Sequence, residues 1–466
     1  MKLKHLLFLA LFSVSSLLIA QDEATMLLNW DDPSIPGSAF FDNAYNEVWG
    51  FVQDGKEYGV IGSTLGTHFV DVDNLLMLPD AFVEGDATGP VIIHRDYHDY
   101  NGYLYAVADE GGSSRLQIID LSGLPASTEV VYSSNELIRT THNIFIDTSQ
   151  AILYALGGND GTFFSIRLID ISDPVNPTLI SSFPNANANI PYVHDAYIED
   201  NLAFLNCGNQ GFYVVDFTNR QSPEILGTMT DYPQNGYNHS GWLHPNGEIY
   251  YLADENHGRD LKVVSVADFS DIYVMNTFNA GSTDPNTIPH NLIIRDNYLY
   301  VSYYYDGVQV FDITDPENPE RAYFYDTYPL AHDNSYEGSW GVYPLLPSGK
   351  FVVSDMQHGL FIFEALPEIV NGVEQTPKEL ARLSIFPNPV QDQIVVDLDV
   401  EVGQRIQPTL MNVQGQIVQS WGARGLQAGK NQFTLALDAQ VAPGFYVLTL
   451  QLEDGQQQTR KITVQR

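Results

Sequence analysis

Five histidines recur at comparable places along the chain and are the residues best suited to chemistry. They are His98, His142, His194, His239 and His290, and a short polar residue follows each one: Asp99, Asn143, Asp195, Ser240 and Asn291. Imidazole nitrogens are common ligands of transition metals, and neighbouring carboxylates can orient them. If the repeats place these side chains around one axis, they could hold a divalent metal ion. Alternatively, each repeat uses its histidine for packing and for hydrogen bonds to the next repeat.

Aromatic residues supply a second set of candidates, for ligand binding. Trp49 and Trp340 replace the histidine in the two repeats that flank the histidine-containing ones. They would either form an aromatic wall for a ligand or pack the junction between the first and last repeats. Tyr303, Tyr304 and Tyr305 form a run that would suit an exposed binding face for a protein or a glycan.

The remaining candidates are weaker. Asp109-Glu110 and Asp254-Glu255 occur in matching ADE motifs, and they would either bind calcium, with His257 nearby, or form exposed acidic turns. Cys207 is the only cysteine, so no intramolecular disulfide forms, and its apolar setting predicts a buried, inert thiol. The sequence contains no G-x-S-x-G elbow, phosphate loop or H-E-x-x-H helix, so we assign no catalytic residue.

The elements that must position these residues are short strands in a repeating unit. An acidic residue closes the third strand of each unit at Asp71, Asp120, Asp170, Asp216, Asp312 and Glu364, with Ser265 in the one remaining place. A period of about 50 residues with about four strands is typical of a β-propeller blade. The sequence therefore predicts an all-β, seven-bladed β-propeller over residues 21–367. We expect the recurrent Asp residues to build turns rather than to catalyse.

The last unit ends after Glu364 without an outer strand, and a matching segment stands before the first unit. Met26–Trp30 resembles the outer-strand segments of other units. We therefore expect it to complete the last blade and close the ring, because an open ring would leave an unpaired edge.

The cores of the repeats resemble those of a known group. The segments LQIIDLSG, IRLIDISDPVNP, FYVVDFTN and VQVFDITDPENP are similar to the LVIVD repeat, and the arrangement of residues 27–365 resembles the choice-of-anchor B family of secreted propellers. This resemblance implies the fold, and it implies no particular activity.

Both the start of the chain and its charge indicate export. A basic start, an apolar run from Leu6 to Ile19 and Ala20 before a polar segment predict a signal peptide over residues 1–20. The formal net charge is −37, from 58 acidic and 21 basic residues, which disfavours binding to nucleic acid. No later stretch is long and apolar enough to predict a membrane span.

The tail predicts a second domain. Residues 368–382 are polar and typical of a linker, and residues 383–466 contain short alternating strands that predict a small β-sandwich. Phe386-Pro387-Asn388-Pro389, Gly415, Pro443-Gly444-Phe445-Tyr446 and Lys461-Ile462-Thr463-Val464 resemble the C-terminal sorting domain of type IX secretion cargo. The resemblance implies a Bacteroidetes host, a partner in the secretion machinery, and a protein that is secreted or attached to the outer cell surface.

Two functions follow from the sequence. The first is a secreted or surface binding module for an unknown protein or glycan. The alternative is a metal-dependent enzyme, oxidative or hydrolytic, that uses the histidines at the mouth of the channel.

Overall fold

The computed structural model describes residues 22–112, 114–282, 284–332, 335–367, 383–386, 388, 390–400, 403–412, 417–452 and 457–465. The expected signal peptide (1–20) and linker (368–382) lie outside the described residues. The chain divides into two compact units, Met1–Ile369 and Val370–Arg466. Each is described here by itself.

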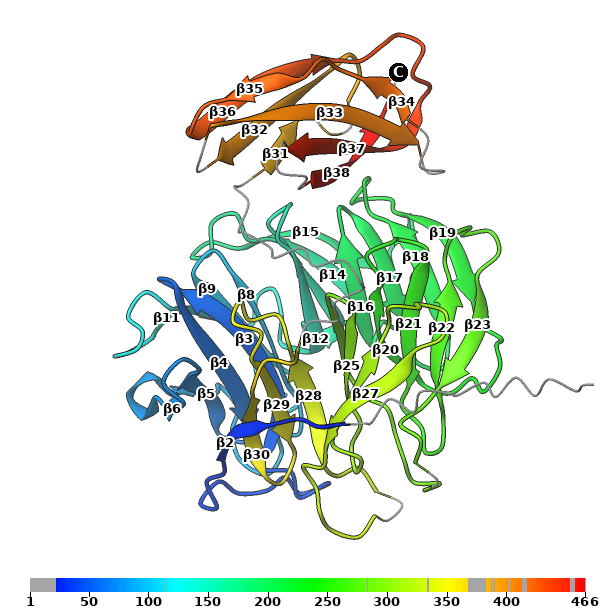
Figure 1. Ribbon diagram of the computed structural model, residues 1–466. Coiled ribbons are helices and arrows are strands. Elements are labelled where there is room, and N and C mark those ends of the chain that lie inside the picture. The colour runs from blue at the N-terminus through cyan, green and yellow to red at the C-terminus, as the bar shows by residue number, and fades with distance from the viewer. Residues whose placement is uncertain are drawn as a thin grey trace, which may run out of the picture. The chain divides into compact units, whose positions relative to one another are not determined.

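The first unit consists of seven sheets in the described residues (Figure 1). Neighbouring strands within each sheet pair antiparallel, except β1, which pairs parallel with β27. The first three contain β3 (Tyr45–Gln53), β4 (Lys56–Ser63), β5 (Gly66–Asp71), β6 (Leu76–Met77) and β7 (Val83–Glu84); β8 (Arg95–Tyr100), β9 (Tyr103–Ala108), β10 (Leu116–Asp120) and β11 (Glu129–Ser134); and β12 (Thr140–Asp147), β13 (Ile152–Asn159), β14 (Phe163–Asp170) and β15 (Thr178–Phe183). A single 3-10 turn, η1 (Pro79–Ala81), separates β6 from β7 in this described part.

The other four sheets follow the same plan. They contain β16 (Asp195–Glu199), β17 (Leu202–Asn206), β18 (Phe212–Asp216) and β19 (Glu224–Met229); β20 (Asn238–Leu243), β21 (Ile249–Asp254), β22 (Leu261–Ser265) and β23 (Tyr273–Phe278); β24 (Leu292–Arg295), β25 (Tyr298–Ser302), β26 (Val308–Asp312) and β27 (Glu320–Tyr325), with β1 (Asp22–Glu23) beside β27; and β28 (Ser339–Tyr343), β29 (Phe351–Asp355), β30 (Gly359–Phe363) and β2 (Met26–Trp30).

The first strand of each sheet lies on the inside of a closed ring. Strand β3 contacts β8, and the contacts continue in order through β12, β16, β20, β24 and β28, which contacts β3 again. The predicted all-β propeller is confirmed. Because all seven inner strands face one axis, residues at equivalent places in different sheets meet there.

Strand β2 (Met26–Trp30) closes the ring. It pairs antiparallel with β30, with Asn29 opposite Phe361 and Trp30 opposite Leu360. The prediction that Met26–Trp30 supplies the outer strand of the last sheet is confirmed. The strand joins the start of the unit to its end, and it covers an edge that would otherwise be unpaired.

The recurrent Asp residues build turns, as predicted. Carboxylate oxygens of Asp120, Asp170, Asp216 and Asp312 each accept a hydrogen bond from the backbone N–H two residues later, at 2.7–2.9 Å. Such a side-chain bond satisfies a donor that the strand ladder leaves free at its end.

Apolar side chains from facing sheets fill the spaces between them. Between the third and fourth sheets, Tyr154 and Leu168 pack in one cluster with Leu205 and Cys207. Cys207 is fully buried, as predicted, and burial raises the pKa of its thiol. Each fully buried aliphatic side chain contributes about 1.5–3 kcal/mol of hydrophobic stabilisation.

The second unit is a small β-sandwich, as predicted. One sheet contains β31 (Leu383–Phe386), β32 (Gln393–Val400) and β36 (Gly429–Ala436), and the other contains β34 (Ile417–Ser420), β33 (Gln404–Asn412), β37 (Gly444–Leu452) and β38 (Gln457–Val464), with β35 (Arg424–Leu426) beside β33. Side chains of both sheets, among them Ile394, Leu410 and Leu448, form one buried core.

Candidate metal centre

Six aromatic side chains form a closed ring at the inner strands, which we call the histidine ring. Its members are His94, His142, His194, His239, His290 and Trp340. The ring centroids of successive histidines from His142 to His290 are 4.1, 4.2 and 4.3 Å apart. His94 lies 4.9 Å from His142, and Trp340 closes the circle at 4.7 Å from His290 and 5.2 Å from His94. Thus five imidazoles meet around one point of the propeller axis.

The start of each inner strand positions its member of the ring. His94 and His194 directly precede β8 and β16, and His142 lies near the start of β12. The pairing of β20 with β21 is irregular between Asn238 and Ser240, and that of β28 with β29 is irregular between Ser339 and Val342. Irregularities of this kind re-aim side chains. They turn His239 and Trp340 out of the ladder and toward the axis.

Four of the five imidazoles have Nδ1 engaged by a protein oxygen. The Nδ1 atom of His194 lies 3.2 Å from the His239 carbonyl oxygen, and that of His290 bonds the Trp340 carbonyl oxygen. A carbonyl oxygen only accepts, so these Nδ1 atoms carry the proton and Nε2 keeps a lone pair. His142 Nδ1 lies 3.0 Å from an Asp109 oxygen, and His94 Nδ1 bonds Glu110. The same arrangement prepares histidines in metal sites to bind through the other nitrogen.

Glu255 brings a carboxylate to the free nitrogens. Its Oε2 lies 3.8 Å from His239 Nε2, and its Oε1 lies 4.0 Å from His290 Nε2. Ligand atoms of His194, His239 and Glu255 all lie within 4.8 Å of one another. The Tyr304 hydroxyl donates a hydrogen bond of 2.6 Å to Glu255 Oε1 and fixes the carboxylate. Around a tetrahedral ion with bonds near 2.1 Å, ligand atoms are separated by about 3.4 Å. Binding therefore requires these side chains to move closer, by about 0.4 Å for the His239–Glu255 pair and by up to about 1.4 Å for the widest pair.

A second group has suitable donors beside the first. Ligand atoms of His94, Asp109 and His142 also lie within 4.8 Å of one another. The side chains of His94, His142, Asp109 and Glu255 keep between 15% and 33% of their surface exposed, so solvent reaches this side of the ring.

Burial keeps the central imidazoles neutral, as metal binding requires. It lowers the pKa of His194 and His239 well below the usual value and that of His290 to about 3. For His142, burial also lowers the pKa, but the hydrogen bond with Asp109 and the charges of Asp109, Glu110 and Glu255 together outweigh burial and raise the pKa. Burial raises the pKa of Glu255. A bound cation would offset this effect, because an opposite charge favours the ionised carboxylate.

His98 does not belong to the ring, which corrects the sequence-based set. Its imidazole packs on Trp49, with centroids 4.4 Å apart, and its Nδ1 lies 3.0 Å from the Asp99 carbonyl oxygen. His94 takes its place. The spacing in the sequence favoured His94, because it lies 48 residues before His142, whereas His98 lies 44 residues before it. The repeat is about 50 residues long. Irregular starts of the inner strands shift the register by a residue or more, so counting along the chain could not decide between them.

The aromatic candidates are also placed differently from the prediction. Tyr303, Tyr304 and Tyr305 are buried, so they form no exposed binding face. The backbone of Tyr304 pairs with Ser339 of the next sheet, which draws this loop into the protein. Trp49 and Trp340 do not share a wall, because Trp340 lies in the histidine ring while Trp49 packs on His98 and Tyr343.

The acids of the ADE motifs do not form exposed turns. Asp109, Glu110 and Glu255 bond or face the histidines of the ring, as described above. Asp254 is fully buried, and its carboxylate forms an ion pair of 2.5 Å with Lys262, which is also fully buried. His257 lies apart and bonds the Ser335 carbonyl oxygen at 3.2 Å. The sequence showed these acids, but only the fold reveals that they face the ring.

Comparison with known families identifies the second unit. Residues 384–465 match the family described as the secretion system C-terminal sorting domain. The chain ends in a type IX sorting domain. This domain indicates export, followed by secretion or attachment to the cell surface, and it implies an interaction with the secretion machinery. No helix in the described part of the chain is long and apolar enough to cross a membrane.

The first unit has neighbours among solved structures. A crystal structure of RRP9 WD40 repeats is 8% identical with a TM-score of 0.49, and a crystal structure of the computationally designed Ika8 protein is 10% identical with a TM-score of 0.41. Each alignment covers 71% of this chain and 99% of the other chain. No curated protein matches the sequence.

Proposed function

We propose that this exported propeller is a metal-binding module that holds a first-row transition-metal ion through His194, His239 and Glu255, with His290 beside them. The observation that carries the proposal is the approach of Glu255 to the Nε2 atoms of His239 and His290, at 3.8 and 4.0 Å. Imidazoles with a single carboxylate suit zinc, copper, iron or nickel better than calcium or magnesium.

The orientation of the imidazoles supports this function. In His290, packing alone would not require Nδ1 to be bonded while Nε2 faces Glu255. In His194 and His290 the backbone fixes Nδ1 as the donor, and in His142 Asp109 does so. Each of these side chains is therefore oriented before an ion arrives, which lowers the cost of binding.

The number of protein ligands separates a binding role from a catalytic one. His194, His239 and Glu255 supply three ligands, and His290, whose Nε2 lies 4.0 Å from Glu255 Oε1, is the nearest candidate for the fourth. A site closed by His290 would suit binding, whereas catalytic zinc sites usually keep one position open. The resemblance of the repeats to the LVIVD and choice-of-anchor B propellers is consistent with a module that works outside the cell. The metal-dependent enzyme remains the second hypothesis, and it requires the fourth position of the ion to stay open.

The test is the metal content of the full-length mature chain. The protein is stripped with a chelator, incubated with Co²⁺, Zn²⁺ or Cu²⁺, desalted and measured by elemental analysis. We expect about one ion per chain, and Co²⁺ absorption bands typical of four-coordinate nitrogen and oxygen ligands.

The variant His239→Ala should lose the ion, and His244→Ala provides a matched control because His244 lies outside the ring. Circular dichroism shows whether each variant is folded. A folded His239→Ala protein that keeps the full metal content contradicts the proposal. Wild-type protein that binds no more metal than surface histidines alone would bind also contradicts the proposal.

A further inference from the structure

Three residues on the more exposed side of the histidine ring form a second group of donors, which the function proposed above does not use. Ligand atoms of His94, Asp109 and His142 lie within 4.8 Å of one another. The imidazole centroid of His142 lies 4.1 Å from that of His194, so this group is next to the first one. We call it the outer group.

Asp109 faces the imidazoles and keeps one carboxylate oxygen available. Its Oδ2 accepts a hydrogen bond of 3.0 Å from His142 Nδ1, whereas its Oδ1 accepts no hydrogen bond from the described residues. A carboxylate oxygen beside two imidazoles is a suitable ligand for a first-row transition-metal ion. The outer group therefore contains the same kinds of donor as the first group.

Glu110 holds the imidazole of His94 in place. Its Oε2 accepts hydrogen bonds of 3.0 Å from the backbone N–H groups of Ile93 and His94, and its Oε1 bonds His94 Nδ1. The Nε2 atom of His94 is therefore the nitrogen that remains for an ion. Carboxylates orient the histidine ligands of metal sites in this way.

The aspartates of the two ADE motifs differ in a way that the repeat does not require. In the second motif, Asp254 is fully buried and forms an ion pair with Lys262. In the first motif the equivalent residue, Asp109, instead faces His142 of the next sheet. Because a blade can be built with this residue turned away from the ring, the position of Asp109 is better explained by a ligand than by packing.

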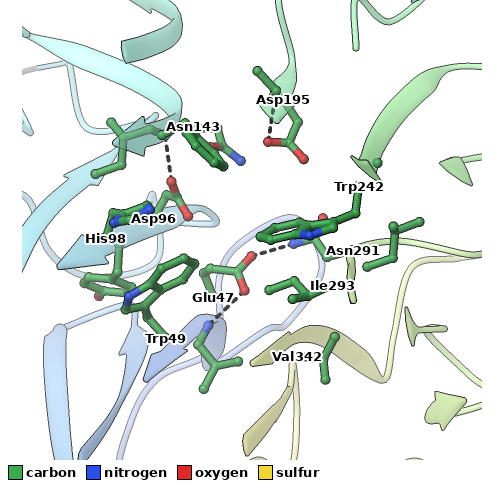
Figure 2. Close-up of a pocket in the computed structure, with 17 residues that line it drawn as sticks. Glu47, Trp49, Asp96, His98, Asn143, Asp195, Trp242, Asn291, Ile293 and Val342 are labelled. Carbon is green, nitrogen blue, oxygen red and sulfur yellow. Dashed lines mark hydrogen bonds between the residues drawn. The ribbon is translucent and has the colours of Figure 1, made fainter. Parts of the chain in front are cut away.

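The other polar side chains of β8 are engaged elsewhere. Figure 2 shows His98 beside Trp49, and Asp96 accepting its hydrogen bond of 2.7 Å from the Ile144 N–H. Neither of these side chains competes for the ligand atoms of the outer group. Asp109 is thus the acid that serves both histidines of this group.

The outer group is more exposed than the first group. The side chains of His94, His142 and Asp109 keep 23%, 15% and 33% of their surface exposed, against 5% for His239. Solvent weakens the attraction between a cation and a carboxylate. The widest pair of ligand atoms must also approach by up to about 1.4 Å to reach the separation of about 3.4 Å around a tetrahedral ion. An ion held here should therefore bind more weakly than the first.

We propose that the outer group binds a second first-row transition-metal ion through His94, Asp109 and His142, with solvent at the fourth position. The pairing of two neighbouring ions rests on the function proposed above. The outer group shares no ligand with the first site, however, so each site can be tested by itself.

Equilibrium dialysis of the full-length mature chain against increasing Zn²⁺ measures both ions, because desalting removes a weakly held one. We expect one ion to bind first and a second to bind at higher Zn²⁺ concentration. Elemental analysis of the dialysed protein gives the number of ions at each concentration.

Two reciprocal variants assign the ions to their sites. Asp109→Asn removes a charge and keeps the shape, and it should weaken the second ion at least about tenfold while the first is unchanged. His239→Ala should lose the first ion and keep the second. Asp173→Asn, at an exposed position, is the matched control and should bind both ions like the wild type. Circular dichroism shows whether each variant is folded.

Electron paramagnetic resonance of the wild-type chain tests whether the ions are neighbours and needs no variant. With one Cu²⁺ per chain we expect the signal of an isolated ion. With two, coupling between neighbouring ions should broaden the signal or remove it.

Two results would overturn the inference. Wild type and folded Asp109→Asn could bind the same number of ions at every Zn²⁺ concentration. Alternatively, two Cu²⁺ ions per chain could give the signal of isolated ions, which would place the second one elsewhere on the protein. If His239→Ala binds both ions like the wild type while Asp109→Asn loses one, the outer site stands and the function proposed above is wrong.

Discussion

The Nε2 atom of His239 lies 3.8 Å from Oε2 of Glu255, and both residues come from one hairpin. His239 belongs to β20, and Glu255 directly follows β21, its antiparallel partner. The irregular pairing at His239 turns the imidazole toward the axis, where the end of β21 also brings the carboxylate. The centre therefore combines a local pair with histidines that other sheets contribute.

Replacing Tyr304 by Phe should weaken metal binding without removing a ligand. The Tyr304 hydroxyl holds Glu255 Oε1 at 2.6 Å, and losing such an outer hydrogen bond typically costs about 10- to 100-fold in affinity. Competition with a coloured chelator measures the change. Tyr273→Phe, at an exposed position, is the control. An unchanged affinity in Tyr304→Phe would mean that Glu255 is not a ligand or needs no support.

Lys262→Met should strongly destabilise the propeller. Lys262 and Asp254 form a fully buried ion pair of 2.5 Å, and Tyr232 donates a hydrogen bond of 2.8 Å to Asp254. Removing one partner of a buried pair costs about 3–5 kcal/mol, because the other charge stays without compensation. Urea unfolding measures the loss. The double variant Lys262→Met/Asp254→Asn should recover part of it, and failure to recover any would show that the cost comes from packing.

Trp30→Ala should weaken the closure of the ring. Trp30 ends β2, and its ring lies 5.6 Å from that of Tyr45 and 5.1 Å from that of His68. Because the side chain is half-buried, we expect a loss of about 2–3 kcal/mol in the free energy of unfolding. Val130→Ala, at an exposed place on the outer strand β11, should cost less than about 1 kcal/mol. Equal losses of unfolding free energy in the two variants would show that the outer strand β2 contributes no more to stability than another outer strand.

Glu47→Gln should make stability depend less on pH. The pKa of Glu47 is raised by burial to about 8 in the folded protein, so the folded state holds its proton longer than the unfolded state. This contribution is complete below about pH 4.5 and is lost as the pH rises toward 8, by at most about 1.4 kcal/mol per pH unit.

Unfolding by urea between pH 5 and pH 8, without metal or amines, measures this dependence. Wild-type protein should lose stability faster than Glu47→Gln across the interval. Glu199→Gln, at an exposed position, should behave like the wild type. Parallel curves for wild type and Glu47→Gln would show that the buried carboxyl is not protonated in the folded state.

Removing residues 384–465 should stop export across the outer membrane. These residues match the sorting domain, and their removal leaves the compact unit Met1–Ile369 intact. In a host with type IX secretion, fractionation followed by immunoblotting should find the truncated protein in the periplasm. The full-length protein should be in the medium or at the cell surface. A truncated protein that still leaves the cell would show that another segment carries the signal.

The sequence by itself determined the architecture, because the propeller is a repeated local pattern. Short stretches of sequence are enough to show alternating strands, Asp turns and an additional strand at Met26–Trp30 before the first repeat. The structure contains each of these features. The sorting domain was visible for the same reason, since its motifs follow one another in order. Four of the ring histidines, His142, His194, His239 and His290, could be found because each starts an inner strand.

Only the tertiary structure decided which residues share the axis. A shift of a few residues at the start of β8 separates His94 from His98, and no count along the chain shows where an inner strand becomes irregular. The run from Tyr303 to Tyr305 is buried because its loop pairs with the next sheet. Glu255 reaches the ring because β21 ends beside β20. All of these relationships depend on contacts between strands and sheets, and such contacts exist only once the ring has closed.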